Sequence, residues 1–399
     1  MTSLAPLEIA SGLVLGLEDE PKVAASRVAP LAALEDAIRP ALERTPCLIS
    51  FSGGRDSSAV LATATALARR EGLPLPIPAT NRFPDVAEAN ESFWQERVVE
   101  ALGLEDWVRL EFGDDLDSVG PIAAAVLREH GLLWPFNAHF HVPLIRAAAG
   151  GSLITGIGGD EIYGESRRRR AALVLAGAVR PERRDVLRVS FALAPHRLRR
   201  AVLLRREHID IPWLTPSALE RLSTAWADFA AAEPLRWSRH MRWCARLRYI
   251  RLGVASLALL AGDHDVRIVH PFTEASFLGA LANARLAAVD RSAIMGALFG
   301  TLLPDEVLGR RSKASFDGVF FGAHSRAFTE DWDGEGADRS LVDVDWLRDN
   351  WRSPAPVSQT YTQLQAAWLA HSGVDRVEQA PQGALEAVPA GGPPEFPGG

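Results

Sequence analysis

Lysine is almost absent from this chain. Of its 43 lysine and arginine residues, only Lys22 and Lys313 are lysines. A compact ammonium and a planar guanidinium are not interchangeable, so a sequence this rich in arginine keeps lysine where a point charge is needed. Lys22 lies in a polar stretch and is expected to be a solvated surface charge. Lys313 is a candidate to stabilise a developing anion, the alternative being a surface lysine retained by chance.

Cysteines are few, and long apolar runs and an excess of positive charge are missing. With Cys47 and Cys244 as its two cysteines, the chain has no disulfide framework and no Cys/His cluster that would indicate zinc or iron. No apolar run reaches the length of a transmembrane helix, and no signal peptide is evident. The net charge of −7 argues against general nucleic-acid binding. We therefore expect a cytoplasmic protein without membrane or nucleic-acid partners.

The composition divides the chain into four parts. Residues 1–45 are predicted to be a short N-terminal extension carrying a helix that stops at Pro40. Residues 46–165 alternate strands and helices, and residues 166–375 are expected to be mainly helical. Residues 376–399 are rich in proline and glycine and are predicted to be a disordered tail.

The alternating part predicts a doubly wound parallel sheet. Buried-strand patterns begin at Cys47 and recur over residues 74–79, 107–112 and 152–155. Stretches with helical periodicity separate them, which is typical of a parallel sheet with helices on both faces. We expect an α/β fold with a mainly helical C-terminal portion.

A loop rich in glycine and serine follows the first strand. It reads Ser52-Gly53-Gly54-Arg55-Asp56-Ser57-Ser58 and leads into a helical stretch. Glycines let a backbone approach a ligand closely, and N–H groups at a helix N-terminus favour an anion. Serine hydroxyls add donors, and Asp56 can hold a metal ion that neutralises phosphates. No Gly-Lys-Ser/Thr follows, so the loop suits the pyrophosphate end of ATP; the alternative is an ordinary capped turn.

A second glycine turn with an acidic pair lies further along the chain. It reads Thr155-Gly156-Ile157-Gly158-Gly159-Asp160-Glu161 and follows the strand at 152–155. If both loops open at the same edge of one sheet, Asp56 and Asp160 can grip magnesium on the phosphates. The alternative is a helix N-terminus whose acids complement the dipole.

Four ordered segments resemble the synthetase domain of asparagine synthetase, a branch of the ATP pyrophosphatase (PP-loop) superfamily. They are the two loops above, then Asp265-Val266-Arg267-Ile268-Val269-His270-Pro271-Phe272, and then a leucine-proline stretch leading to Lys313 before Phe316. The resemblance implies the ATP pyrophosphatase fold, with ATP and Mg²⁺ as cofactors. The sequence is also similar to the lasso-peptide cyclases, which share this domain and close macrolactams with it.

The resemblance implies roles at matching positions. Asp56 and Asp160 would bind magnesium, and Lys313 would stabilise charge between the α-phosphate and the attacking carboxylate. Asp265 would orient or deprotonate the nucleophile, although a salt bridge or loop cap within residues 264–267 explains it nearly as well. The residues implied in nucleotide binding are Ser50, Ser52, Gly53, Gly54, Asp56, Ser57, Ser58, Thr80, Thr155 and Gly156.

Two departures from the family pattern narrow the range of reactions that we expect. Residue 2 is Thr2 rather than a catalytic cysteine, and Cys47 and Cys244 lie in strand and helix patterns, so glutamine is not expected to be the nitrogen donor. Ile157 replaces the glutamate that asparagine-forming enzymes carry between the loop glycines, and isoleucine cannot accept a proton or hydrogen-bond an amine.

The sequence therefore predicts an ATP-dependent amide-forming ligase that adenylates a carboxylate and releases pyrophosphate before an amine attacks. The expected partner is a small-molecule or peptide substrate with a carboxylate, with a precursor peptide or a leader-binding protein as a further candidate. An arginine-rich stretch over residues 165–208 is either a solvated helix face or a dock for an acidic peptide. Alternatives are asparagine synthesis from ammonia or with a separate glutaminase, a tRNA- or nucleotide-modifying ATP pyrophosphatase, and an ATP-holding protein without chemistry.

Overall fold

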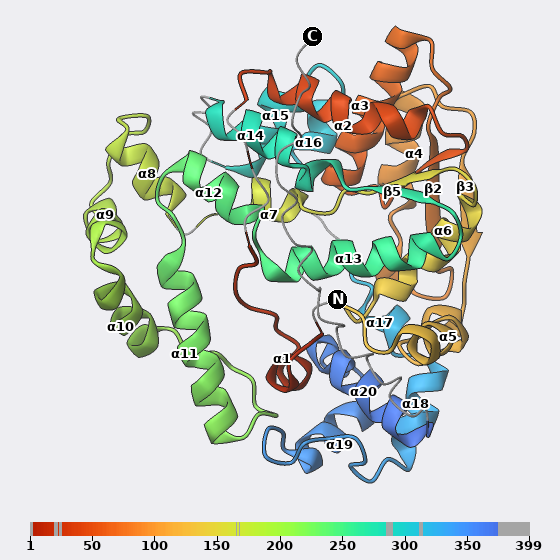
Figure 1. Cartoon of the computed structure of the whole chain (residues 1–399), viewed down its shortest axis with the longest axis vertical. Coiled ribbons are helices and arrows are strands. Elements are labelled where there is room, and N and C mark those ends of the chain that lie inside the picture. Colours follow the sequence, from red (N-terminus) through yellow and green to blue (C-terminus); the bar gives the residue numbers. More distant parts are fainter. Residues whose placement is uncertain are drawn as a thin grey trace, which may run out of the picture.

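A five-stranded parallel β-sheet lies toward the right-hand side of the molecule in Figure 1. The computed structural model describes residues 3–19, 23, 26–164, 166, 168–284, 290–310 and 314–373. The strands are β1 (Cys47–Ser50), β2 (Ile77–Arg82), β3 (Val108–Glu111), β4 (Ser152–Ile154) and β5 (Arg267–Val269). Their spatial order is β3-β2-β1-β4-β5, and every neighbouring pair is parallel. The predicted α/β fold is confirmed, because the order reverses between β1 and β4 as in doubly wound sheets.

Alternating side chains of the central strands enter two different cores. Cys47 and Ile49 of β1 pack with helices on one face, whereas Leu48 between them packs on the other face. Successive side chains of a strand point to opposite faces, so a strand covered on both sides carries apolar residues at each position.

Helices cover both faces of the sheet. The first face carries α2 (Pro30–Leu42), α3 (Arg55–Glu71), α4 (Ser92–Ala101) and α14 (Ala275–Asn283). The second face carries α5 (Pro121–His130), α6 (Val142–Ala147) and α13 (Arg248–Gly262). Short 3₁₀ turns complete the connections: η1 (Ala87–Ala89), η2 (Asp114–Leu116), η3 (Ala138–His141) and η4 (Pro271–Thr273).

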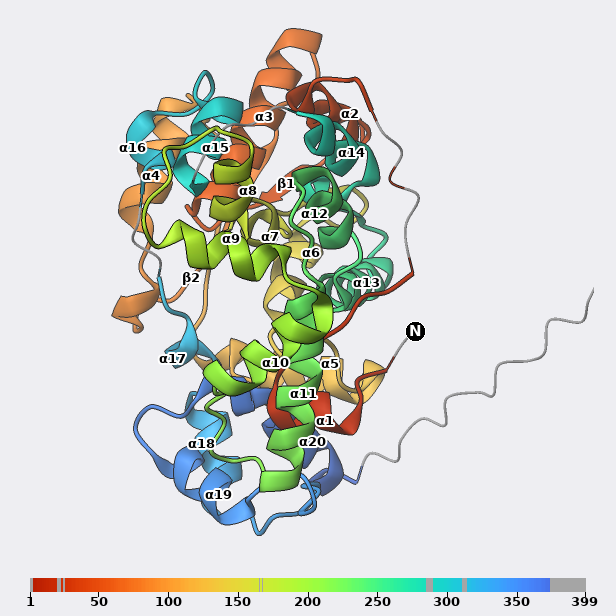
Figure 2. The same cartoon turned by 90° about the vertical axis from the view of Figure 1, so that its left-hand side faces the viewer.

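The remaining described elements after β4 are helical except for β5, as the sequence predicted for this region. Those near the sheet are α7 (Gly159–Tyr163), α12 (Trp237–Cys244), α15 (Arg291–Phe299) and α16 (Asp305–Leu308). A column beside them contains α8 (Arg169–Leu175), α9 (Asp185–Leu193), α10 (His196–Arg206) and α11 (Pro216–Ala232) (Figure 2). The lower part of the molecule in Figure 2 contains α17 (Asp317–Phe320), α18 (Ala323–Glu330), α19 (Val344–Arg352), η5 (Ser358–Thr360) and α20 (Tyr361–His371).

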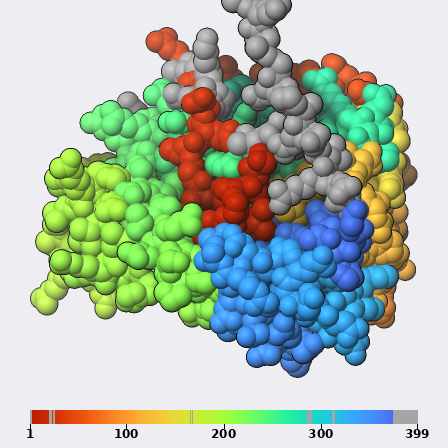
Figure 3. All heavy atoms as spheres, turned by 60° about the horizontal axis from the view of Figure 1, so that its bottom comes forward, coloured from red at the N-terminus to blue at the C-terminus, as the bar shows by residue number. Residues whose placement is uncertain are grey.

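The N-terminal residues lie against the C-terminal helices. Helix α1 (Pro6–Ser11) contacts α20, and Gln359 Nε2 donates to the Ser11 carbonyl over 2.9 Å. Trp213 Nε1 donates to the Ala10 carbonyl over 2.8 Å. Figure 3 shows this red segment between the green helices and the blue C-terminal region. Segments from both ends of the described chain and its middle thus share one apolar core.

Two sequence expectations about elements differ from the structure. Helix α2 continues through Pro40 to Leu42, because the flanking residues Leu34, Ile38 and Leu42 are fully buried and tertiary packing outweighs the lost hydrogen bond. Strand β5 was not expected. Its three residues are too few for a period to be recognised.

Within the described residues, no helix combines the length and apolarity needed to cross a membrane.

Candidate active site

The first glycine loop begins where β1 ends at the carboxyl edge of the sheet. Gly53 has φ +78°, and a Cβ there would lie 2.8 Å from Gln95 Cγ, so both the backbone angle and the space require glycine. The hydroxyls of Ser52 and Ser57 lie 3.1 Å apart, and the Gly54 N–H donates to Ser52 Oγ over 3.2 Å. These contacts hold the serine donors together at the N-terminus of α3, as an anion cradle requires.

The second glycine loop packs directly on the first. Gly158 has φ +95°, and a Cβ on Gly159 would lie 2.4 Å from Asp56 Cγ. A Cβ on Gly156 would lie 3.0 Å from the Ser57 nitrogen. The loops therefore meet because glycines let their backbones approach, and the prediction that both open at one edge of the sheet is confirmed.

Asp56 and Asp160 converge on a guanidinium. Arg291, the first residue of α15, donates to Asp56 Oδ2 over 2.5 Å and also to Asp160 Oδ1. Burial raises the pKa of Asp56 above its ordinary value, although Arg291 opposes this shift. Asp56 Oδ1 is buried without a hydrogen-bond partner among the described residues. The two carboxylates thus hold one cation between them and keep an oxygen available for another.

Hard divalent cations prefer such oxygen ligands, so the donor set fits Mg²⁺. Asp56 and Asp160 would hold the ion, which would neutralise phosphate charge when bound. Because Arg291 contacts the same two carboxylates, it competes with a metal for them.

Other predicted nucleotide-binding residues lie at the same edge: the side chains of Ser58 and Thr80 are buried, whereas Ser50 is half-buried. Ser50 ends β1, and Ser58 lies in the first turns of α3, where its hydroxyl has no hydrogen-bond partner among the described residues. Thr80 donates to the Phe51 carbonyl over 2.7 Å and accepts from Trp107 Nε1 over 3.1 Å. Its hydroxyl is therefore used within the protein.

Thr155 follows β4 and faces a buried imidazole. Its hydroxyl lies 2.7 Å from His270 Nδ1, and the Ile157 N–H donates to it over 3.3 Å. Burial lowers the pKa of His270 to about 3, with His141 adding to the effect. His270 is therefore neutral at physiological pH and serves as a hydrogen-bond partner for this loop.

Asp265 is not brought to this site. It precedes β5 and lies at the amino edge, since β5 is parallel to β4 and the Asp56–Asp160 pair follows the carboxyl ends. Its carboxylate is 84% exposed and pairs with Arg44 over 2.9 Å. Its φ of 52° marks a turn. The interpretation of Asp265 as a group acting on the nucleophile is therefore wrong, and its salt bridge is made with Arg44 rather than within residues 264–267.

Lys313 lies outside the described residues. The residues on either side of its segment are anchored near the first loop: Arg310 donates to the Gly53 carbonyl over 2.8 Å and pairs with buried Glu91. The Ala314 N–H donates to Glu91 Oε1 over 2.7 Å. The Arg310 guanidinium on one side of Lys313 and the Ala314 backbone N–H on the other thus contact one carboxylate beside the phosphate loop.

Sequence reasoning missed several polar groups at this edge. Arg291 starts an ordinary helix, and no motif distinguishes it. Gln95 Nε2 donates to the Ser52 carbonyl over 3.2 Å. Arg82 ends β2 with Nε and Nη2 buried and unpartnered within the described part of the chain, and its guanidinium lies 5.2 Å from the Trp107 ring centre. Of these residues, only Arg82 could have been suspected from the sequence, because it lies at the end of a strand.

Comparison with known proteins identifies the family. A family model described as asparagine synthase matches residues 31–372. This match covers most of the chain, so the chain belongs to the asparagine synthase family and is an ATP-dependent amide-forming ligase of that family. No curated protein matched the sequence.

Proposed function

We propose that this protein adenylates a substrate carboxylate with ATP and Mg²⁺, releases pyrophosphate, and transfers the acyl group to an amine. In this reaction a carboxylate oxygen bonds to the α-phosphorus while the bond to pyrophosphate breaks. The amine nitrogen then bonds to the acyl carbon, AMP leaves, and the amine loses a proton.

The convergence of Asp56, Asp160 and the serine loop carries the proposal. A buried carboxylate oxygen, backbone N–H groups at the start of α3 and the unpartnered Arg82 nitrogens surround one edge of the sheet. These groups suit a triphosphate whose negative charge must be shared between donors and a cation. The absence of a Walker lysine after the loop glycines favours departure of pyrophosphate over transfer of the γ-phosphate.

The chain's own groups would act mainly by positioning. Ser52, Ser57 and the N–H groups of the first loop would hold pyrophosphate. Lys313 would add positive charge at the α-phosphate, where an interaction formed in the transition state accelerates the step.

A cavity lined by arginines supports a peptide as the substrate. Its volume is about 450 Å³, and its charged lining residues are Arg168, Arg199, Arg236, Arg239 and Glu233. The excess of guanidinium groups favours an acidic segment, because planar guanidinium groups bind carboxylates with two parallel hydrogen bonds. We propose that the protein tailors a precursor peptide by forming an internal amide, a macrolactam.

Product analysis tests the reaction. Purified protein with ATP, Mg²⁺ and candidate substrates should form AMP and pyrophosphate and no ADP. Asp56→Asn should reduce pyrophosphate release by about 10²-fold or more, because charge stabilisation at the phosphates is lost. Asp349→Asn on the exposed surface of α19 is the matched control and should retain activity. Formation of ADP, or wild-type turnover by folded Asp56→Asn, would contradict the proposal.

A substrate comparison separates the possible products. A precursor peptide should become lighter by one water without gaining mass from an added amine. Asparagine formed from aspartate and ammonia would instead identify a small-molecule synthetase, the function that Ile157 in the second loop disfavours.

A further inference from the structure

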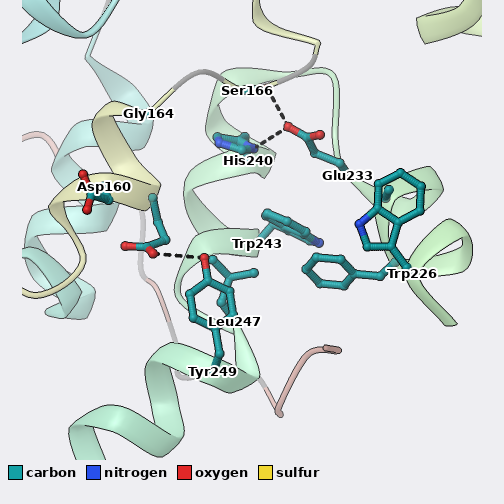
Figure 4. A pocket seen from close by; sticks show the side chains of 12 residues that line it. Asp160, Gly164, Ser166, Trp226, Glu233, His240, Trp243, Leu247 and Tyr249 are labelled. Carbon is teal, nitrogen blue, oxygen red and sulfur yellow. Dashed lines mark hydrogen bonds and ion pairs between the residues drawn. The ribbon is translucent and has the colours of Figure 1, made fainter. Parts of the chain in front are cut away.

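A cavity beside the second glycine loop combines aromatic and acidic walls (Figure 4). Its volume is about 240 Å³, below the range of roughly 300–1,000 Å³ that holds drug-sized ligands, so it suits a group the size of one amino-acid residue. Asp160 and Glu161 place one end of it next to the proposed metal ligands. The other walls come from α11, α12 and the start of α13.

The aromatic wall is preorganised by stacking. The Trp243 ring lies 5.6 Å from the His240 ring at an interplanar angle of 21°, and 5.0 Å from the Phe229 ring at 32°. Trp226 and Tyr249 complete the aromatic lining. Trp243 Nε1 is buried and has no hydrogen-bond partner among the described residues, so it is a donor suited to a carbonyl oxygen.

The charged groups that line this cavity are acidic. They are Asp160, Glu161 and Glu233, and the described lining residues include no lysine or arginine. Burial lowers the pKa of His240 to about 4, with Arg169 and Arg168 contributing, so its imidazole adds no positive charge near pH 7. Tyr249 donates to Glu161 Oε1 over 3.1 Å, and Ser166 donates to Glu233 Oε1 over 2.6 Å, which fixes both carboxylates on the wall.

We propose that this cavity binds an organic ammonium group, the amine-bearing end of the acceptor substrate. The apolar body of the ligand lies against Trp226, Phe229 and Trp243. Aromatic faces attract cations, and the carboxylates of Glu161 and Glu233 add to this attraction. The assignment of the ligand as acceptor depends on the proposed ligase function, whereas the preference for a cation depends on the cavity alone.

Three probes of one shape and different charge test the wild-type protein. Phenethylammonium, phenethyl alcohol and 3-phenylpropionate are titrated into protein without ATP at pH 7, and binding is followed by calorimetry. We expect the ammonium to bind at least about tenfold more tightly than the alcohol, and 3-phenylpropionate, which can also bind at the arginine-lined cavity, not to displace it. Equal affinities of the ammonium and the alcohol, or displacement of the ammonium by 3-phenylpropionate, would overturn the inference.

Matched variants locate the binding. Glu233→Gln keeps the size of the side chain and removes its charge, and it should weaken phenethylammonium binding several-fold while leaving the alcohol unchanged. Glu220→Gln makes the same change at an exposed position of α11 and should have no effect. If Glu233→Gln does not fold, Phe229→Leu, which reduces the aromatic wall, should lower the preference for the ammonium; an unchanged preference would contradict the assignment.

The outcome separates this inference from the ligase proposal. Selective ammonium binding without AMP formation would retain the cavity and reject the proposed reaction. AMP formation without a preference for the ammonium would retain the reaction and place the acceptor elsewhere.

Discussion

Arg291 shows how much of the site depends on one residue outside the motifs. Asp56 and Asp160 were predicted to meet because each follows a strand of the same sheet, and the structure confirms their proximity through a shared guanidinium. Arg291 lies 131 residues from Asp160 in sequence, at an ordinary helix start, so no local pattern could identify it. Asp265 was predicted from a motif, but a motif does not say on which side of a short strand its residues lie.

Arg291→Gln should destabilise the protein and change its response to magnesium. Without the guanidinium, two adjacent carboxylates repel, which should lower the free energy of unfolding by about 1–3 kcal/mol given their partial exposure. Mg²⁺ should restore more stability to the variant than to the wild type, because its ligands no longer have a competing cation. Thermal unfolding with and without Mg²⁺ measures both effects.

Arg221→Gln at an exposed position of α11 is the control for this experiment and should resemble the wild type. A variant of Arg291 with unchanged stability and unchanged magnesium response would show that the contact has no energetic role.

At the scale of elements, the two glycine loops act as one unit. The sequence predicted the four strands β1–β4 and both loops, since Gly and Ser clusters after apolar runs are strong local signals. It did not predict β5, nor the continuation of α2 through Pro40, because both depend on packing against distant segments. The sequence showed the glycines that permit close contact between the loops, but it could not show the contact itself.

Gly159→Ala should separate the two loops. The added Cβ would meet the Asp56 carboxyl group at 2.4 Å, so the loops must shift apart. We expect a loss of stability of about 1–3 kcal/mol and a strong loss of pyrophosphate release. Gly262→Ala at the end of α13 adds the same methyl group where nothing lies within 4 Å, and should be neutral or slightly stabilising. Full activity of Gly159→Ala would mean that the loops tolerate separation.

At the scale of the whole molecule, buried imidazoles lie both in the helical part and at the sheet edge. His240 lies in α12 beside the cavity, and His270 follows β5 at the phosphate edge. The sequence predicted a mainly helical region after the sheet, but it could not show which helices approach the site, because that depends on side chains from separate helices.

Stability should therefore fall as the solution becomes mildly acidic. The pKa of His270 is lowered to about 3 and that of His240 to about 4. As pH falls, these histidines are therefore protonated in the unfolded chain at a higher pH than in the folded protein. The histidine contribution is complete above the unfolded pKa of about 6.5 and is lost as pH falls toward the folded values. Between pH 6.5 and 5, each histidine should cost about 1–2 kcal/mol.

Chemical unfolding from pH 7.5 to 5 measures this effect. His270→Gln should show a shallower dependence than the wild type, whereas substitution of the exposed His371 by Gln should leave the slope unchanged. An identical slope for His270→Gln and the wild type would mean that another group controls acid sensitivity.

The contact between α1 and α20 also means that the fold cannot be completed until both helices have been synthesised. The Ser11 carbonyl can accept its hydrogen bond from Gln359 only after that residue has been synthesised, 348 residues further along the chain. At synthesis rates of about 5–20 residues per second, the N-terminal helix spends roughly 20–70 s without its final neighbour. In the nascent chain, the side chains of α1 that pack on α20 therefore lack this neighbour until that helix emerges from the ribosome.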